Sequence, residues 1–463
     1  MQSALLIDIG STYTKVSLLD LTNLEIMGKN QAYTTVEEDV TIGLEKALAG
    51  IEGWEEADYK LSCSSAAGGL KIIALGLVPD LTAEAAKRAA LGAGSKILDT
   101  YSFEITDKQL KEMKEKNPDI ILLAGGTDGG NKETIIHNAR MLAKSELECP
   151  IIIAGNRVVE DKIEKILSEA DKETYITENV MPRLEELNIE PARKTIREIF
   201  LEKIIQAKGL KKVNELIDGV IMPTPAAVLK AAALLADGHG REEGLGELIV
   251  VDIGGATTDV HSIARGNPQE GNVNWRGLEE PYQKRTVEGD LGMRYSAPSL
   301  LDAIGKREFK IQMEDRDYPL CEKELNEHID TLHTEVEYLP EGEKEQVIDN
   351  LLARNATKMA VARHTGIMKT VYTPMGATSI QEGKDLTRIK NVIGTGGIIV
   401  NNEDPYQILE GCLYDNQDKP ELLAPIDADF LIDQDYIMAA VGLLSEVEPE
   451  KALQFMKKHI NKL

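Results

Sequence analysis

Asp8-Ile-Gly-Ser-Thr12 and Asp252-Ile-Gly-Gly-Ala-Thr-Thr258 are two short segments that share one pattern, although they lie far apart in the chain. Each segment begins in the last two residues of an apolar run, residues 4–9 and 247–253, of the kind that forms a buried strand. A second strand-like run begins after each segment, so each one predicts a β-hairpin with a small polar turn. Because the pattern occurs twice, the sequence predicts two similar half-molecules that face a cleft.

Both predicted hairpins have the composition of phosphate-binding loops. Glycine lets the backbone approach a phosphate group so that amide hydrogens point at its oxygens, and Ser or Thr hydroxyls add further donors. The aspartate at the end of each strand is predicted to hold Mg²⁺ through water or to orient an attacking water. The predicted residues of the first hairpin are Asp8, Gly10, Ser11, Thr12, Thr14 and Lys15, the lysine to neutralise charge. Those of the second hairpin are Asp252, Gly254, Gly255, Thr257 and Thr258.

A single Asp-x-Gly segment is equally well explained as an ordinary β-turn. Two such segments, each after an apolar strand, favour phosphate binding. A third segment, Val392-Ile-Gly-Thr-Gly-Gly-Ile-Ile399, predicts a strand followed by glycines, which suits the approach of an adenosine to the backbone. Its predicted ATP-binding residues are Gly394, Thr395, Gly396 and Gly397.

The three segments, in this order, resemble the phosphate-1, phosphate-2 and adenosine motifs of the actin, Hsp70 and sugar-kinase superfamily. Pro223-Thr-Pro-Ala-Ala227 resembles the entry to that superfamily's hinge helix, and its Pro-Thr-Pro predicts a turn. Glu288-Gly-Asp-Leu-Gly-Met293 resembles the segment after phosphate-2, and Tyr436-Ile-Met-Ala-Ala440 resembles the final helix near the hinge. The resemblance implies ATP and Mg²⁺ as cofactors, and it adds Gly289 and Gly292 to the ATP-binding residues.

The predicted fold class is α/β, with duplicated actin/Hsp70-like (ribonuclease H-like) ATPase domains around a nucleotide cleft. Between them, strand-like and helical runs alternate, which is typical of a parallel sheet and predicts an inserted Rossmann-like domain. The predicted organisation is the first half of ATPase lobe I over 1–96, the inserted domain over 97–215, ATPase lobe II with a charged helical region over 216–390, and the adenosine motif with closing helices over 391–463.

A glycine-rich stretch within the predicted inserted domain, Leu123–Lys132, does not satisfy the Walker A pattern. Gly125 and Gly130 have the required separation, but Asn131 stands where the lysine is needed. An ordinary strand-to-helix turn is one interpretation of this stretch. The alternative is that the turn, at the carboxyl end of a parallel strand, meets a ligand or a partner.

Composition narrows the classes of function. The net charge of −26 argues against broad attraction to nucleic acid or to an anionic membrane. The four cysteines lie far apart, which excludes an obvious zinc or iron–sulfur site and suits a reducing cytosol. Apolar runs are too short for a transmembrane helix, and the first residues lack the features of a signal peptide. The predicted localisation is cytoplasmic, with neither nucleic acid nor membrane as a partner.

Longer motifs along the whole chain resemble the glutamate mutase accessory protein family of the MutL type. These motifs are Leu122-Leu-Ala-Gly-Gly-Thr-Asp-Gly-Gly-Asn131, Asn179-Val-Met-Pro-Arg183, residues 220–228, Asp252–His261 and Val392–Gly397. The resemblance implies an ATPase with subunits of an adenosylcobalamin-dependent mutase as partners, either glutamate mutase or a related aminomutase. It implies a reactivating chaperone that uses ATP hydrolysis to exchange damaged cobalamin for intact cofactor, with Asp8 and Asp252 governing Mg²⁺ and water.

Two alternatives stay open on the residues themselves. A small-molecule kinase of the same superfamily would release ADP in response to its substrate without a protein partner. An actin-like assembly protein would form polymers under nucleotide control without turnover. The electron-transferring activators of acyl-CoA dehydratases need clustered cysteines, which the spacing of the four cysteines excludes.

Overall fold

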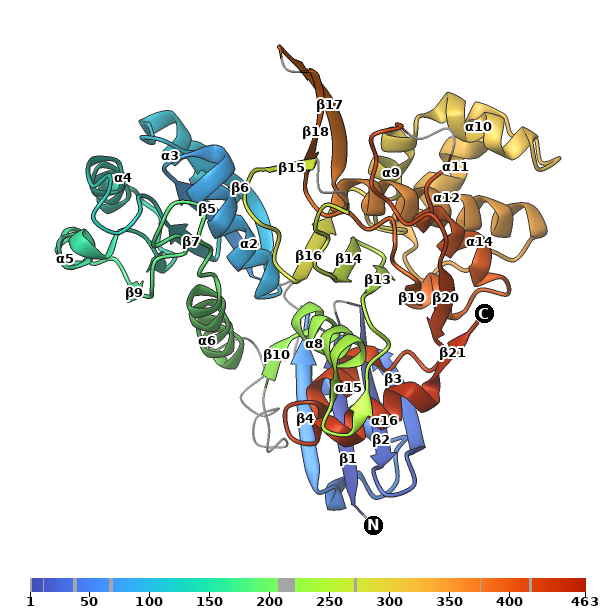
Figure 1. Cartoon of the computed structure of the whole chain (residues 1–463). Helices are drawn as coiled ribbons and strands as arrows, with labels where there is room; N and C mark the ends of the chain where they lie inside the picture. Colours follow the sequence, from blue (N-terminus) through green and yellow to red (C-terminus); the bar gives the residue numbers. More distant parts are fainter. Residues whose placement is uncertain are drawn as a thin grey trace. The chain divides into compact units, whose positions relative to one another are not determined.

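The computed structural model describes residues 2–10, 12–35, 40–65, 70–206, 221–269, 273–374, 376–415 and 419–463 (Figure 1). Ser11, one of the predicted phosphate ligands, lies outside these residues. The chain divides into two compact units. The first contains Met1–Ala231, Gly277–Glu279 and Ala439–Ala452, and the second contains Ala232–Arg276, Glu280–Met438 and Leu453–Leu463.

The first unit contains a five-stranded sheet with the order β3-β2-β1-β4-β10. β1 is paired antiparallel with β2, β2 antiparallel with β3, β1 parallel with β4, and β4 parallel with β10. β1 is buried along most of its length, as its apolar sequence predicts. The strands are β1 (Ser3–Ile9), β2 (Tyr13–Asp20), β3 (Glu25–Tyr33), β4 (Tyr59–Ser64) and β10 (Ile221–Pro223).

The second unit contains a sheet with the order β16-β14-β13-β19-β20-β21. Here again the first three strands in sequence pair antiparallel, and two further strands, β19 and β20, extend the sheet in parallel. The strands are β13 (Leu248–Ile253), β14 (Thr258–Ile263), β16 (Gln283–Glu288), β19 (Asn391–Thr395), β20 (Asp429–Asp433) and β21 (Ile460–Lys462).

The two sheets share one topology. In each, a strand, its hairpin partner and a third antiparallel strand occupy one side, and two parallel strands occupy the other side. β1 and β13 hold the same place in the two orders, and these are the strands that end in Asp-Ile-Gly. The predicted duplication of an α/β, ribonuclease H-like domain is therefore confirmed.

A separate parallel sheet of the first unit has the order β6-β5-β7-β8-β9 (Figure 1). It confirms the parallel α/β alternation predicted from the sequence, and it contains one strand more, β5, before the predicted run. Its strands are β5 (Lys71–Gly76), β6 (Lys96–Ser102), β7 (Ile120–Leu123), β8 (Ile151–Ile153) and β9 (Thr174–Ile176). Its helices are α2 (Glu84–Gly92), α3 (Asp107–Lys116), α4 (Glu133–Lys144), α5 (Glu160–Ser168) and α6 (Glu190–Gln206).

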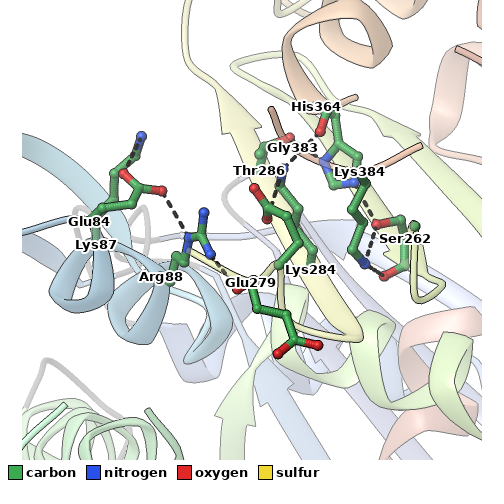
Figure 2. Close-up of polar contacts among 12 residues, drawn as sticks. Glu84, Lys87, Arg88, Ser262, Glu279, Lys284, Thr286, His364, Gly383 and Lys384 are labelled. Carbon is green, nitrogen blue, oxygen red and sulfur yellow. Dashed lines mark hydrogen bonds and ion pairs between the residues drawn. The ribbon is translucent and has the colours of Figure 1, made fainter. Parts of the chain in front are cut away.

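The core of the first unit is shared by its two sheets. Leu5 of β1, Ile72 of β5 and Ala89 of α2 belong to one buried cluster. Leu278 belongs to the same cluster, and the neighbouring carbonyl of Glu279 accepts a hydrogen bond of 2.8 Å from Arg88, as Figure 2 shows. The short segment Gly277–Glu279 is therefore anchored within the first unit.

The charged region of the second unit is helical, as its sequence predicts. Its buried side chains, among them Phe309, Leu325 and Leu352, pack in one cluster with residues of the sheet such as Val251. The helices are α9 (Ala297–Ile304), α10 (Lys306–Glu314), α11 (Glu322–Thr334) and α12 (Glu343–His364). A three-stranded sheet consists of β15 (Val273–Arg276), β17 (Ile367–Thr373) and β18 (Gly376–Glu382).

The remaining elements are short or connect the sheets. Gly442 of α15 packs so closely on the backbone of Ala227 of α8 that a side chain at this glycine has no room. None of the helices within the described ranges has both the length and the apolar character needed to cross a membrane. The elements are α1 (Val40–Leu48), α8 (Thr224–Asp237), β11 (Gly238–His239), β12 (Glu242–Glu243), α13 (Gly397–Val400), α14 (Pro405–Leu409), α15 (Met438–Leu444) and α16 (Pro449–His459).

One local prediction is wrong. The sequence Pro223-Thr-Pro225 was expected to form a turn, but β10 ends at Pro223 and α8 begins at Thr224. Proline is tolerated in the first turn of a helix, where its missing N–H has no partner to lose. The segment therefore passes from strand to helix without an intervening turn.

Candidate phosphate-binding hairpins

The two Asp-Ile-Gly hairpins close with the same hydrogen bond. In the first, the pairing of β1 with β2 ends at Ile9 and Thr14, and the amide of Gly10 donates to the carbonyl of Tyr13 at 3.0 Å. In the second, the pairing ends at Ile253 and Thr258, and the amide of Gly254 donates to the carbonyl of Thr257 at 2.9 Å. The similarity in sequence is therefore a similarity in backbone geometry.

Asp8 lies at the end of β1 among polar side chains of its own unit. Its Oδ1 accepts a hydrogen bond from Thr224 Oγ1 at 2.7 Å and one from Cys63 Sγ at 3.4 Å. Burial, and then the charge of Asp8, raises the pKa of the Cys63 thiol well above its ordinary value. The thiol is therefore protonated and available as a donor. These two contacts fix the position of the Asp8 carboxylate.

The other predicted residues of the first hairpin differ in their surroundings. Thr14 is fully buried, and its hydroxyl lies 2.9 Å from the hydroxyl of Thr34. Thr12 is partly exposed, and its carbonyl accepts from the amide of Thr34 at 2.7 Å. Lys15 lies opposite Asp8 in the register of the hairpin. Thr34 was not identified from the sequence, since it lies beyond the motif on the chain after β3.

The second hairpin is held by the segment Gly289–Ser296. The amides of Met293 and Arg294 donate to the carbonyls of Gly254 and Gly255 at 3.0 and 2.8 Å. Ser296 Oγ lies 2.7 and 2.8 Å from the carbonyl oxygens of Ala256 and Gly289 and can donate to either, and Thr258 Oγ1 donates to the carbonyl of Leu291 at 2.7 Å. A side chain at Gly292 would collide with the backbone of Ala256 and Thr257. The predicted residues Gly289 and Gly292 thus lie in the segment that packs on this hairpin.

Two ion pairs involve residues that contact the second hairpin. Asp259 Oδ1 lies 2.6 Å from Arg285, and Asp259 Oδ2 accepts from Thr257 Oγ1 at 3.2 Å. Arg294 NH2 lies 3.1 Å from the buried carboxylate of Asp349 on α12. Since Arg294 also binds Gly255 through its backbone, it connects the hairpin to the helical region.

The predicted adenosine segment lies beside the second hairpin within the same unit. β19 pairs with β13 so that Thr395 is opposite Asp252. Gly396 has φ = +98°, and a Cβ there would lie 2.9 Å from Asp252 Oδ1 and collide with the carbonyl of Ile253. Glycine is therefore required at this position, both for its backbone conformation and for the close approach.

Asp433 at the end of β20 anchors this segment and was not identified from the sequence. Its carboxylate accepts from Thr395 Oγ1 at 2.9 Å and from the amides of Ile437 and Met438 at 2.9 and 3.0 Å. Burial raises the pKa of Asp433, and these hydrogen bonds oppose the shift. An aspartate that ends a strand before a helix was its only sequence signal. Gly394 is also enclosed, because a Cβ there would meet the side chain of Leu409 at 2.9 Å.

The structure thus brings the predicted residues together in two groups, one in each unit. The first group consists of Asp8, Gly10, Thr12, Thr14 and Lys15. The second group consists of Asp252, Gly254, Gly255, Thr257, Thr258, Gly289, Gly292, Gly394, Thr395, Gly396 and Gly397. Their roles in binding ATP remain predictions.

Another cluster of chemically capable side chains in the second unit includes Ser262 of β14. Figure 2 shows Ser262 Oγ with His364 Nε2 at 2.8 Å and Lys384 Nζ at 3.1 Å. A serine beside a potential base is the pattern of a nucleophile. However, all three residues are fully buried, and burial keeps the pKa of His364 well below its ordinary value. The cluster therefore satisfies buried polar groups and has no exposed atom that a substrate could reach.

Similarity to known proteins agrees with the motifs of the sequence. A model of the family described as MutL protein matches residues 4–460. Protein MutL of Clostridium tetanomorphum is 51% identical over 471 residues, which cover 100% of each chain. The chain belongs to the MutL protein family. This membership confirms the family resemblance that the motifs indicated.

Solved structures that match most of this MutL family member share little sequence identity with it. Xylulose kinase from Lactobacillus acidophilus has 10% identity and a TM-score of 0.36, covering 100% of this chain and 93% of that one. Component A of (R)-2-hydroxyglutaryl-CoA dehydratase from Acidaminococcus fermentans has 10% identity and a TM-score of 0.33, covering 98% and 99%. A glucokinase of the ROK family from Streptomyces griseus, in complex with glucose and AMPPNP, has 10% identity and a TM-score of 0.32, covering 98% and 99%.

Proposed function

We propose that this chain is an ATP-dependent accessory protein that reactivates an adenosylcobalamin-dependent mutase, either glutamate mutase or a related aminomutase. In this proposal, ATP hydrolysis promotes the exchange of damaged cobalamin for intact cofactor on the mutase. The observation that supports nucleotide binding is the repeated hairpin, which closes with the same hydrogen bond at Gly10 and at Gly254. Membership of the MutL family supports the mutase part.

Each hairpin is proposed to bind phosphate oxygens of ATP. Their glycines allow close approach of the backbone, and Thr12 and Thr257 are partly exposed hydroxyl residues of the described parts of the two loops. Thr14 and Thr258 are fully buried, so they contribute by holding the start of each returning strand. Gly394–Gly397 are proposed to approach the adenosine.

Asp8 and Asp252 are the residues proposed to hold Mg²⁺ through water. Among the described residues there is no group of three or more His, Cys, Asp or Glu side chains that could hold a metal ion alone. This fits Mg²⁺, which is usually bound by one or two carboxylates together with substrate phosphates and water. When bound, the ion would neutralise charge on the phosphates. Thr224 and Cys63 fix the Asp8 carboxylate, so that it can orient the attacking water.

A reactivation assay tests the whole proposal. Glutamate mutase is inactivated with hydroxocobalamin, and the chain is added with ATP, Mg²⁺ and adenosylcobalamin. Turnover should return with ATP and fail to return with a non-hydrolysable analogue. A related aminomutase is tested in the same way. Failure to restore turnover of every such mutase would contradict the proposal that the partner is a mutase. ADP release that requires only a small molecule would support a kinase instead, and polymerisation without turnover would support an assembly protein.

A second assay tests the site separately from the partner. Asp8→Ala and Asp252→Ala are each expected to abolish ATP hydrolysis while the circular dichroism spectrum stays unchanged. Asp80→Ala is the matched control, because Asp80 is exposed and lies outside both hairpins. Hydrolysis at the wild-type rate in either of the first two variants would contradict the site assignment, whatever the result with the mutase.

A further inference from the structure

The parallel sheet of the first unit has a position where bound ligands are expected. Its order β6-β5-β7-β8-β9 is the doubly wound order 2-1-3-4-5. From β5 the chain continues to β6 on one side, and from β7 it continues through α4 to β8 on the other side (Figure 1). In such sheets, ligands bind at the carboxyl ends of the two strands where the direction of winding changes. Here those strands are β5 and β7, which are paired at Leu75 and Leu123.

A glycine-rich loop, residues 124–131, follows β7 at this position. Gly125, Gly126 and Gly129 have φ values of +144°, +74° and +78°, which L-residues rarely adopt. A side chain at Gly126 would also collide with the carbonyl of Asn131, whereas Gly129 has open space around it. Glycine at Gly126 is therefore required by a close approach within the loop as well as by its backbone conformation.

Two buried asparagines hold this loop in one conformation. Asn156 Oδ1 accepts from the amide of Gly129 at 3.1 Å, and its Nδ2 donates to the carbonyl of Asn131 at 3.0 Å. Asn179 Nδ2 donates to the carbonyl of Gly126 at 3.0 Å and to Asp128 Oδ1 at 2.9 Å. The Asp128 carboxylate is therefore engaged by the loop's own support, and it also accepts from the amide of Arg157 at 3.0 Å. A loop held at this many points is preorganised.

The backbone amides of residues 125–130 in this loop fall into two sets. Those of Asp128, Gly129 and Gly130 donate to Pro182, Asn156 and Thr127. For the preceding three, those of Gly125, Gly126 and Thr127, no acceptor exists among the described residues. Gly125 and Gly126 are buried, and buried amides without an acceptor are rare in folded proteins because each costs about 1–3 kcal/mol. Three successive donors without acceptors, in a rigid loop at the winding change, point to a bound acceptor.

We propose that Gly125, Gly126 and Thr127 bind the phosphate group of a small ligand seated between the carboxyl ends of β5 and β7. Successive amides present positive partial charge, which selects an anion, and a phosphate has enough oxygens for three donors. Asn131 replaces the lysine of a Walker A loop, so the site suits a single phosphate group rather than a nucleoside triphosphate. The first turn of α4 follows the loop directly, and two of its amides are already engaged, that of Thr134 by Asn131 Oδ1 at 3.2 Å and that of Ile136 by the carbonyl of Lys132 at 3.3 Å, so the proposed site rests on the loop amides alone. This site is distinct from the two Asp-Ile-Gly hairpins and does not depend on their function.

The test uses inorganic phosphate as the probe and the full chain, saturated with a non-hydrolysable ATP analogue and Mg²⁺. Bound radiolabelled phosphate is measured by equilibrium dialysis for wild type and for the isosteric pair Thr127→Asn and Thr127→Asp. The asparagine variant is expected to bind as wild type does. The aspartate variant adds a negative charge at the proposed site and should bind about tenfold more weakly or worse. Equal binding by the two variants, or no binding by wild type, overturns the proposal.

Two further arms separate the remaining explanations. Gly126→Ala should abolish phosphate binding, while Gly129→Ala, with a similar φ and an amide already bonded to Asn156, should retain it. Asp8→Ala should bind phosphate normally, which distinguishes this site from the hairpins even if the proposed ATPase activity is absent. Binding of acetate but not of phosphate overturns the assignment to phosphate, and binding of a phosphoserine peptide but not of free phosphate overturns the assignment to a small ligand.

Discussion

Thr224 Oγ1 donates a hydrogen bond of 2.7 Å to Asp8 Oδ1, and so connects the start of α8 to the end of β1 within the first unit. The two residues are 216 positions apart in the sequence. The parallel pairing of β10 with β4, and of β4 with β1, brings them together. A carboxylate held on one oxygen has a restricted orientation, so Thr224 is a positioning residue for Asp8.

Thr224→Val is therefore expected to slow ATP hydrolysis. Loss of one hydrogen bond to a charged group is worth about 1.5–3 kcal/mol, which corresponds to roughly a 10- to 150-fold lower kcat if the whole effect falls on the reaction. Thr224→Ser retains the hydroxyl and should keep most of the activity. The measurement is the steady-state rate of ATP hydrolysis by each variant, and thermal unfolding shows whether each variant is folded. A valine variant as active as the serine variant would show that this contact does not position the carboxylate.

Gly396→Ala is expected to destabilise the second unit and to weaken nucleotide binding. An alanine at φ = +98° is strained, and its Cβ would collide with the carbonyl of Ile253 at the strand end that carries Asp252. Gly246→Ala is the matched control, because Gly246 has φ = +79° but nothing near its Cβ position. In both variants the strain alone should lower the free energy of unfolding by about 1–3 kcal/mol, so both should unfold at a lower temperature. Only the variant at Gly396 should also lose affinity for ADP in calorimetric titration; equal losses in the two would remove the special role of this contact.

Local patterns made the hairpins and most elements predictable. Each hairpin is specified within a few residues by an apolar strand, a glycine turn and a second strand, and the alternation after residue 97 specified a parallel sheet. β5 was missed, because Lys71–Gly76 is a short apolar run that periodicity cannot assign to a strand or a helix. Pro223-Thr-Pro225 was misassigned because proline starts both turns and helices.

The surroundings of the candidate site were less predictable, because long-range contacts determine them. Thr224 reaches Asp8, and Asp433 reaches Thr395, only through parallel strand pairs whose register the sequence does not state. Thr14 and Thr258 fit the motif of a phosphate loop, yet the structure turns both hydroxyls to internal partners. The positions of the hairpins could therefore be predicted from residue types. Which hydroxyls stay exposed depends on the pairing of distant strands.

The ion pair between Arg294 and Asp349 is expected to be strongly coupled. The side chain of Asp349 is 1% exposed and that of Arg294 13%, so removal of the arginine leaves a carboxylate buried without its cation. Arg294→Met should destabilise the protein by about 3–5 kcal/mol, and Asp349→Leu in the same background should recover much of this loss. A double-mutant cycle from urea unfolding measures the coupling. Additive effects of the two substitutions would mean that the pair contributes no interaction energy, and that another group, such as His328 with its Nε2 3.8 Å from Asp349 Oδ1, compensates Asp349.

His261 on β14 is expected to make the second unit sensitive to acid. Burial, and then the charge of Arg285 opposite it in the sheet, lowers the pKa of His261 to about 3. In the unfolded chain its pKa is about 6.5. Between these values the unfolded state binds a proton that the folded state does not bind, so the free energy of unfolding falls as the pH falls.

Between pH 7 and pH 5 this single group should lower the free energy of unfolding by about 2 kcal/mol. His261→Leu should remove that share of the loss, measured as the change in urea midpoint between the two pH values. His364, whose pKa burial also lowers, should still contribute to the remaining pH dependence. His239→Leu is the control, since His239 is exposed and should leave the pH dependence as it is in wild type. If His261→Leu shows the same change of midpoint as wild type, then His261 is not the buried neutral group that drives the acid sensitivity.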